Sequence, residues 1–239
     1  MDRCLPGMRG DKMNRQEILQ IAKPILFNTE MVRATLDGRK TVTRRVVKDL
    51  PDCDFIELEL NPEVCYDGDL EKTAVHCGLY ATFESHGDYI VDFPVRKSPY
   101  QVGDILYARE TWSPVWVRPK RYQYKASPEV SENVPISWYP SIHMPKEAAR
   151  IFLKVTGVRC ERLQDISEAQ IKAEGIDTCS HCYHFNGECK DFRAARECKL
   201  QSAFIKTWNS TIKKQDLSKY GWQANPWVWV YEFEKVAVE

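Results

Sequence analysis

The run Pro226–Val236 constrains the fold more than any other segment, because it concentrates Val, Trp, Tyr and Phe in one short stretch. These residue types favour a pleated strand over a helix. Shorter β-prone segments lie at Ile25–Asn28, Lys40–Val47, Val102–Thr111 and Ala148–Val158. Short strands that alternate with helices predict an α+β protein built on a small, strongly bent sheet or barrel.

Helix signals lie between the predicted strands. Thr29 is the expected N-cap of a helix over Glu30–Leu36, which an Asp-Gly pair would close. Ser167 and the Gln three residues later form a capping-box pattern, and Gly175 is the expected end of that helix. A longer helix is predicted from about Asp191 to Trp208.

The charge of the chain is balanced overall and uneven along its length. The 34 basic side chains equal the 34 acidic ones, which argues against a globally polybasic nucleic-acid-binding protein. Residues 1–48 hold eleven Lys/Arg against five Asp/Glu, whereas residues 49–100 hold three against twelve. The acidic stretch lacks a clear helical or strand period, so it is interpreted as a surface insertion, most simply a solvated loop.

Several classes of protein are disfavoured by what the sequence lacks. No apolar stretch approaches the roughly 18 residues of a membrane span, and the first residues carry no apolar secretion core. We therefore expect a soluble, cytoplasmic protein. The sequence contains no Walker loop, Rossmann fingerprint, G-x-S-x-G elbow or H-E-x-x-H helix, which disfavours nucleotide-hydrolysing and dinucleotide-dependent enzymes.

The nine cysteines are numerous for a chain of this length. In a reducing compartment clustered cysteines indicate metal ligands or buried thiols rather than disulfides. The candidate zinc ligands, called the cysteine group below, are Cys179, Cys182, Cys189 and Cys198. Four thiolates suit a closed, structural tetrahedral zinc site, in which His181 or His184 could replace one thiolate, although the spacing is not that of a standard zinc finger. Simple burial of these thiols is the alternative.

A second, weaker metal candidate lies in the acidic stretch. Cys65, His76 and Cys77 are of suitable types for zinc, but their spacing is not diagnostic.

Four segments, taken in order, resemble a known family. They are Pro24–Arg45, which contains Gly-Arg-Lys-Thr-Val-Thr-Arg-Arg, Gly103–Trp112, Arg150–Gly175 and Asn225–Glu234. Together they resemble the ASCH domain family, whose fold is related to the PUA RNA-binding domain. The stretch Pro140–Pro145 is similar to ASCH proteins of bacteriophages and prophages.

The resemblance implies a PUA-like small β-barrel flanked by helices. It spans residues 21–236 as a single domain after an N-terminal extension, 1–20, with an acidic insertion at about 49–100 and a Cys-rich insertion at about 177–200. The expected ligand is RNA or a modified nucleoside. No membrane partner is expected.

An enzymatic activity is also implied by the resemblance. One compact family member is an amidohydrolase that removes the acetyl group of N4-acetylcytidine, and its active residues correspond to Lys40, Thr43 and Glu174. In this assignment Thr43 is the nucleophile, Lys40 the base and Glu174 the supporting carboxylate, and catalysis needs no cofactor. Without the resemblance, Lys40 and Thr43 are ordinary solvent-facing strand residues and Glu174 is a solvated helix end.

Two difficulties accompany this assignment. Lysine is a base only where burial or nearby cations lower its pKa from about 10.4, whereas a close carboxylate keeps it protonated. The sequence does not decide between these effects. On a regular strand, Lys40 and Thr43 face opposite sides, so a shared pocket requires a bulge or twist between them.

The candidate substrate-binding residues are two neighbours of Lys40 and Thr43 in the sequence and three residues of the Gly103–Trp112 segment. They are Arg39, Arg44, Arg109, Glu110 and Trp112. Trp112 is a candidate for stacking on a base, although most aromatic residues of the chain are expected in the core. A cross-strand ion pair is the alternative for Arg109 and Glu110.

Two functional hypotheses remain open at this level. One is amide hydrolysis of an N4-acylated cytosine, and the other is a non-enzymatic RNA-binding module that uses the basic N-terminal block. His143 is a further candidate for contact with a phosphate or base, with an ordinary hydrogen-bonded loop residue as its alternative.

Overall fold

The structure is a computed structural model of the 239-residue chain. It describes residues 14–48, 57–65, 74–85, 89–115, 121–127, 136–176 and 200–238, with backbone alone for 57–65, 74–85 and 89–96. Within this part of the chain no helix combines the length and apolar character that crossing a membrane requires.

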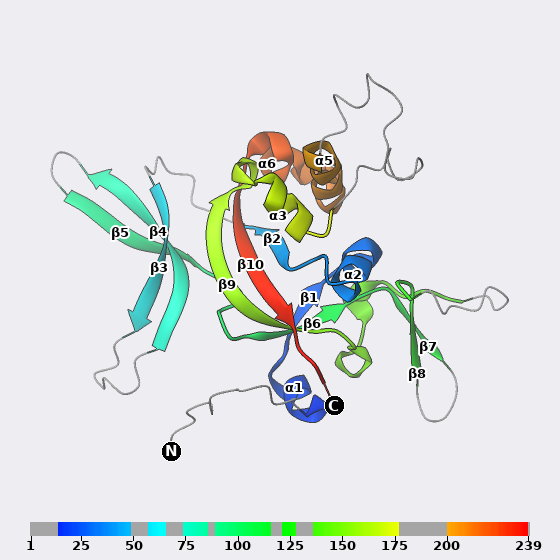
Figure 1. The fold of residues 1–239 in the computed structure, drawn as a ribbon. Helices are drawn as coiled ribbons and strands as arrows, with labels where there is room; N and C mark the ends of the chain where they lie inside the picture. Colours follow the sequence, from blue (N-terminus) through cyan, green and yellow to red (C-terminus); the bar gives the residue numbers. More distant parts are fainter. Residues whose placement is uncertain are drawn as a thin grey trace, which may run out of the picture. The chain divides into compact units, whose positions relative to one another are not determined.

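Strands of three sheets carry the fold (Figure 1). The largest sheet has five strands in the order β1 (Lys23–Leu26), β6 (Ile105–Arg109), β9 (Phe152–Arg162), β10 (Trp227–Lys235) and β2 (Val42–Val46). β1 pairs with β6 in parallel, whereas β6 with β9 and β10 with β2 are antiparallel. This mixed sheet has β1 and β2 as its edges, so it is open over the described residues. The α+β class is confirmed, and the small closed barrel stays a prediction.

The predicted loop character of the acidic stretch is wrong. β3 (Glu57–Cys65), β4 (Ala74–Ser85) and β5 (Tyr89–Lys97) form an antiparallel three-stranded sheet. The pairing explains the error, because Glu57 lies opposite Thr82, and a local window of sequence does not contain a partner so far along the chain. A separate hairpin joins β7 (Trp112–Val115) to β8 (Arg121–Tyr124).

The described helices are short. The α-helices are α1 (Arg15–Ile21), α2 (Thr29–Leu36), α3 (Glu168–Ala173), α5 (Leu200–Thr211) and α6 (Leu217–Tyr220). Single turns of 3₁₀ helix lie at Ser141–His143, Lys146–Ala148, Leu163–Asp165, Lys214–Asp216 and Trp222–Ala224.

Helix caps follow the sequence signals closely, with one exception. The capping box of Ser167 and Gln170 opens α3 as predicted. Thr29 is not the N-cap of α2, because it is already helical and the Asn28 side-chain oxygen accepts a hydrogen bond from the Met31 amide at 2.8 Å. Asn and Thr are both favourable N-cap residues, so their identities alone do not show which of the two adjacent residues caps the helix.

The chain divides into two compact units. The first comprises Met1–Val32, Gly103–Lys154 and Glu234–Glu239, and the second Arg33–Val102 and Val155–Phe233. In the first unit, Ile18 of α1 is fully buried in a core with Ile105 and Phe152. Because α1 runs over Arg15–Ile21, the domain start predicted at residue 21 falls at the last residue of a core helix.

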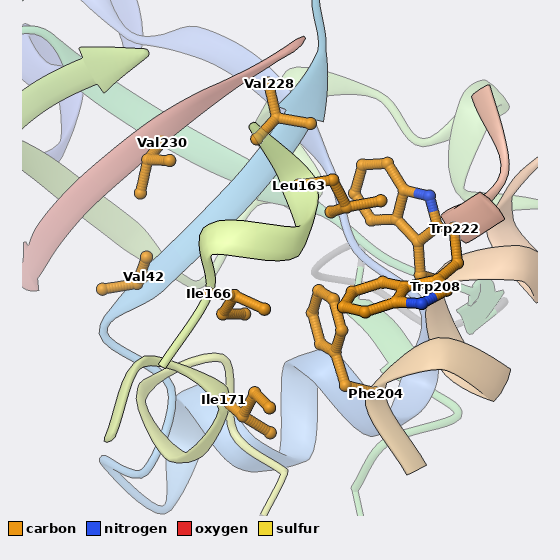
Figure 2. Packing of buried hydrophobic residues seen from close by; sticks show 9 residues of the cluster. All are labelled: Val42, Leu163, Ile166, Ile171, Phe204, Trp208, Trp222, Val228 and Val230. Atoms are coloured by element: carbon orange, nitrogen blue, oxygen red, sulfur yellow. The ribbon is translucent and has the colours of Figure 1, made fainter. Parts of the chain in front are cut away.

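The second unit has an aromatic core between strands and helices (Figure 2). Val42, Val228 and Val230 face it from β2 and β10. The Phe204 ring packs near two tryptophan rings, with its centroid 6.2 Å from that of Trp208 and 6.0 Å from that of Trp222. Burial of large aromatic side chains contributes several kcal/mol to folding, which fixes α3 and α5 against the strands.

Candidate functional site

Lys40 is positioned by the turn that ends α2. Gly38 has φ +76°, which a residue with a side chain adopts only at a cost, and the Lys40 amide then donates to the Ala34 carbonyl at 3.0 Å. Lys40 forms an isolated antiparallel bridge with Glu174, two residues before β2 begins. The backbone therefore places residues 40 and 174 side by side, although they are far apart in the sequence.

Glu174 is held at the C-terminus of α3. The following residue, Gly175, has φ +88°. A Cβ atom on Gly175 would lie 2.5 Å from the Ala34 Cβ and 3.1 Å from the Lys40 Cβ, so only glycine permits this approach of α3 to Lys40. In the Glu174-Gly175 pair, the first residue supplies the carboxylate, and the second, which lacks a side chain, lets the end of α3 approach Lys40.

The Lys40 side chain is fully buried and forms an ion pair with Glu174. Its Nζ lies 2.6 Å from the Glu174 Oε2, and the two side chains are 0% and 6% exposed. The same Nζ donates to the Val42 carbonyl at 2.7 Å and to the Glu174 carbonyl at 3.1 Å. Three acceptors match the three donors of an ammonium group, so this geometry satisfies the protonated lysine.

Burial and neighbouring charges act on the pKa of Lys40 in opposite directions. Burial lowers this pKa, and the Glu174 carboxylate and its hydrogen bond raise it. Arg45 and Arg44 lower the pKa further by charge repulsion. The net direction is downward, which eases loss of the proton compared with a lysine in water.

Arg44 bridges two carboxylates within the protein. Its guanidinium Nη1 lies 3.2 Å from the Glu174 Oε1, while Nε and Nη2 donate to the Glu161 Oε1 at 3.1 and 2.6 Å. The Arg44 side chain is 1% exposed. Each oxygen of Glu174 therefore faces its own cation, Lys40 on one side and Arg44 on the other.

Thr43 is buried but is not hydrogen-bonded to this pair. Its Oγ1 is shielded from solvent and has no hydrogen-bond partner among the described residues. Thr43 lies opposite Tyr231 in a regular β2–β10 register, without a bulge over Val42–Val46. Lys40 and Glu174 therefore form an ion pair, whereas the Thr43 hydroxyl has no hydrogen bond to either of them.

Comparison of the chain with models of known families, with curated proteins and with solved structures finds no match. The function must therefore be inferred from the geometry of the residues around Lys40 and Glu174.

The predicted binding residue Arg39 lies beside the Lys40–Glu174 pair but is engaged within the protein. It donates to the Gly175 carbonyl at 2.8 Å and to Asp37 at 2.9 Å, with its side chain partly exposed. Arg44 is buried, as described above. Arg39 and Arg44 therefore both make contacts within the second unit.

The other three predicted binding residues belong to the first unit. Glu110 is buried and pairs through both oxygens with Arg150, at 2.8 and 2.9 Å. An ion pair does form there, as the alternative interpretation expected, but its cation is Arg150. Arg109 donates to the Ile142 carbonyl instead.

Trp112 packs among aromatic rings of the same unit. Its ring centroid lies 5.7 Å from that of Tyr122 and 5.4 Å from that of Tyr139. The indole Nε1 is buried without a hydrogen-bond partner in the described structure. Base stacking by Trp112 stays a prediction.

His143 is exposed in a 3₁₀ turn, and its amide donates to the Pro140 carbonyl at 3.0 Å.

The metal predictions fall mostly outside the described residues. The whole cysteine group and both nearby histidines lie in residues 177–199, which the structure does not describe. For Cys65, His76 and Cys77 only the backbone positions in β3 and β4 are described. Elsewhere in the described part, no three His, Cys, Asp or Glu side chains are placed to hold an ion.

Glu161 is the member of the site that the sequence did not suggest. It lies on β9 two residues after Arg159, so both side chains share one face of the strand. The Arg159 Nε lies 3.0 Å from the Glu161 Oε2. The sequence feature that could have indicated Glu161 is the opposite charge of Arg159 two residues earlier on a partly buried strand.

Proposed function

We propose that this chain is an ASCH-type protein that binds RNA or a modified nucleoside and hydrolyses the amide of an N4-acetylcytidine-like substrate. The observation that carries the proposal is the buried Lys40–Glu174 pair, with Nζ 2.6 Å from Oε2. Buried ionisable groups with shifted pKa values are frequent at catalytic sites. In this proposal the five strands of the mixed sheet belong to a PUA-like barrel, and β3–β5 belong to the acidic insertion.

The proposed reaction begins at Thr43. Its hydroxyl attacks the acetyl carbonyl and passes its proton to Lys40, which gives a tetrahedral intermediate. Lys40 returns the proton to N4 as the C–N bond breaks, so cytidine leaves and the acetyl group remains on Thr43. Water then hydrolyses the ester and releases acetate, with Lys40 again transferring the proton.

The lowered pKa of Lys40 supports its role as a base. A lysine accepts a proton only as the neutral amine, and burial together with Arg44 and Arg45 favours that form. Glu174 opposes it, but Arg44 draws part of the carboxylate charge through Oε1. Substrate binding must bring Lys40 and Thr43 within hydrogen-bond reach, about 2.6–3.2 Å, because such contacts often tighten only in the complex.

The alternative, a non-enzymatic RNA-binding module, depends on cations that reach phosphates. Arg44 is buried against Glu174 and Glu161, and Arg39 contacts Asp37. These contacts compete with phosphate, which favours the enzymatic proposal over the electrostatic one.

The direct test is release of cytidine from N4-acetylcytidine by the purified protein. Lys40→Ala and Thr43→Ala should each abolish release, whereas Lys213 and Thr41, which are both exposed, provide matched controls whose alanine variants should remain active. If the wild-type protein releases cytidine no faster than the Lys40→Ala variant, the proposal is wrong. RNA binding that weakens with salt, in the absence of turnover, would favour the alternative.

A further inference from the structure

A line of alternating charges connects the buried Lys40 to the protein surface. The order is Lys40, Glu174, Arg44, Glu161, Arg159 and Glu232, each joined to the next by an ion pair. Side-chain exposure rises from 0% at Lys40 to 47% at Glu232. The six residues come from five places in the second unit: the segment before β2, the end of α3, β2, β9 and β10.

We propose that Glu161 is a positioning residue for the Lys40–Glu174 pair and that it acts through Arg44. The hydrogen bonds of Arg44 to the two glutamates support this role. Glu161 takes both the Nε and the Nη2 of Arg44 on one oxygen and leaves Nη1 for Glu174. The fork geometry of a guanidinium fixes its plane when two of its donors are held.

The consequence for Glu174 follows from the charge balance. With Glu161 present, the Arg44 charge is shared between two carboxylates, so Glu174 retains enough negative charge to hold Lys40. Without Glu161, Arg44 has Glu174 as its remaining described carboxylate partner and draws it away from Nζ. Among the described residues, the charges that shift the pKa of Lys40 are those of Glu174, at the C-terminal end of α3, and of Arg45 and Arg44 on β2.

This inference rests on the proposed function only in treating Lys40 as the proton-transfer group, and its test does not require activity. The measurement is the titration of Lys40, followed by the ¹³Cε resonance of lysine-labelled protein and assigned by its absence in Lys40→Arg. Glu161→Gln should lower the titration midpoint by about one pH unit, a typical effect of one nearby charge. Glu168→Gln, which removes an exposed carboxylate from α3, should leave it unchanged.

A double-mutant cycle separates action through Arg44 from action across space. In an Arg44→Gln background, the shift caused by Glu161→Gln should fall to less than half. An equal shift with and without Arg44, or no shift in the wild-type background, would overturn the proposal. A purely structural role for Glu161 predicts lower stability and an unchanged Lys40 midpoint.

A second variant covers the case in which Glu161→Gln does not fold. Arg159→Gln removes a partly exposed cation and strengthens the hold of Glu161 on Arg44, so the Lys40 midpoint should rise. A fall or no change contradicts the proposal. If the midpoints respond as expected but cytidine is not released, the positioning role stands and the proposed function fails.

Discussion

Replacing Glu174 with Gln tests the energetics of the buried pair. The change keeps the size of the side chain and an amide oxygen that accepts hydrogen bonds, but it removes the negative charge beside the buried Lys40 ammonium, which still donates to the Val42 carbonyl and to the backbone carbonyl of residue 174. Removing one partner of a buried pair costs about 3–5 kcal/mol of unfolding free energy. Because these acceptors remain, we expect a loss at the lower end of that range, about 3 kcal/mol.

Lys40→Met should cost less. Glu174 still has Arg44, whose Nη1 lies 3.2 Å from Oε1, so the carboxylate is not left without a cation. We expect about 2 kcal/mol, from lost hydrogen bonds at the two carbonyls and at Glu174. The double variant should be more stable than the sum of the single losses predicts, since neither charge is then stranded.

The assay is urea denaturation followed by tryptophan fluorescence, because Trp208 and Trp222 lie in the core of the same unit. With a slope of about 3 kcal/mol per M, a loss of 3 kcal/mol moves the midpoint by about 1 M. Glu168→Gln on the same helix is the control and should stay within about 0.5 kcal/mol. A Glu174→Gln loss below about 1 kcal/mol, or a larger loss for Lys40→Met than for Glu174→Gln, would show that the Lys40 charge does not depend on Glu174 in this way.

Three other predictions follow from particular residues. Gly175→Ala should destabilise the protein by at least about 1–2 kcal/mol and disturb the Lys40 titration, because alanine is strained at φ +88° and its Cβ meets Ala34; an unchanged melting temperature would contradict this. Burial, with Glu161 next, raises the pKa of the Cys160 thiol from 9.0 to about 12. The unfolded thiol therefore ionises first, so the unfolding free energy should fall between about pH 9 and pH 12, and a Cys160→Ala variant should lose less over that range; equal slopes would count against this. Protein purified without added zinc should contain about one zinc per chain if the cysteine group is a closed site, and metal analysis giving far less would show that these thiols bind no structural zinc.

Local signals in the sequence predicted particular elements of the second unit. Ser167 with Gln170 specified the start of α3, and the β-prone run near the C-terminus became β10 over Trp227–Lys235. These elements depend on neighbours within a few residues, which a sequence displays directly. The three-stranded sheet of the acidic stretch was missed because its pairing depends on distant residues.

The site was predictable only in part, for a physical reason. The resemblance named Lys40 and Glu174, and the structure joins them at 2.6 Å. The interactions of Glu161 were not visible, since its link to Arg44 joins β9 to β2 across more than a hundred residues. The spacing of Lys40 and Thr43 indicated that they share a pocket only with a bulge or twist between them; the β2–β10 register is regular over Val42–Val46, and the Thr43 hydroxyl is hydrogen-bonded to neither Lys40 nor Glu174.

The roles of Thr43 and Lys40 are tested most directly by looking for the acetyl group on Thr43. Protein mixed with N4-acetylcytidine would be acid-quenched during turnover and digested, and the peptide containing Thr43 analysed by mass spectrometry. We expect an acetyl ester on Thr43 in the wild-type protein and none in Lys40→Ala. Cytidine release without acetylation of that peptide, or no release at all, would contradict the assigned nucleophile and base.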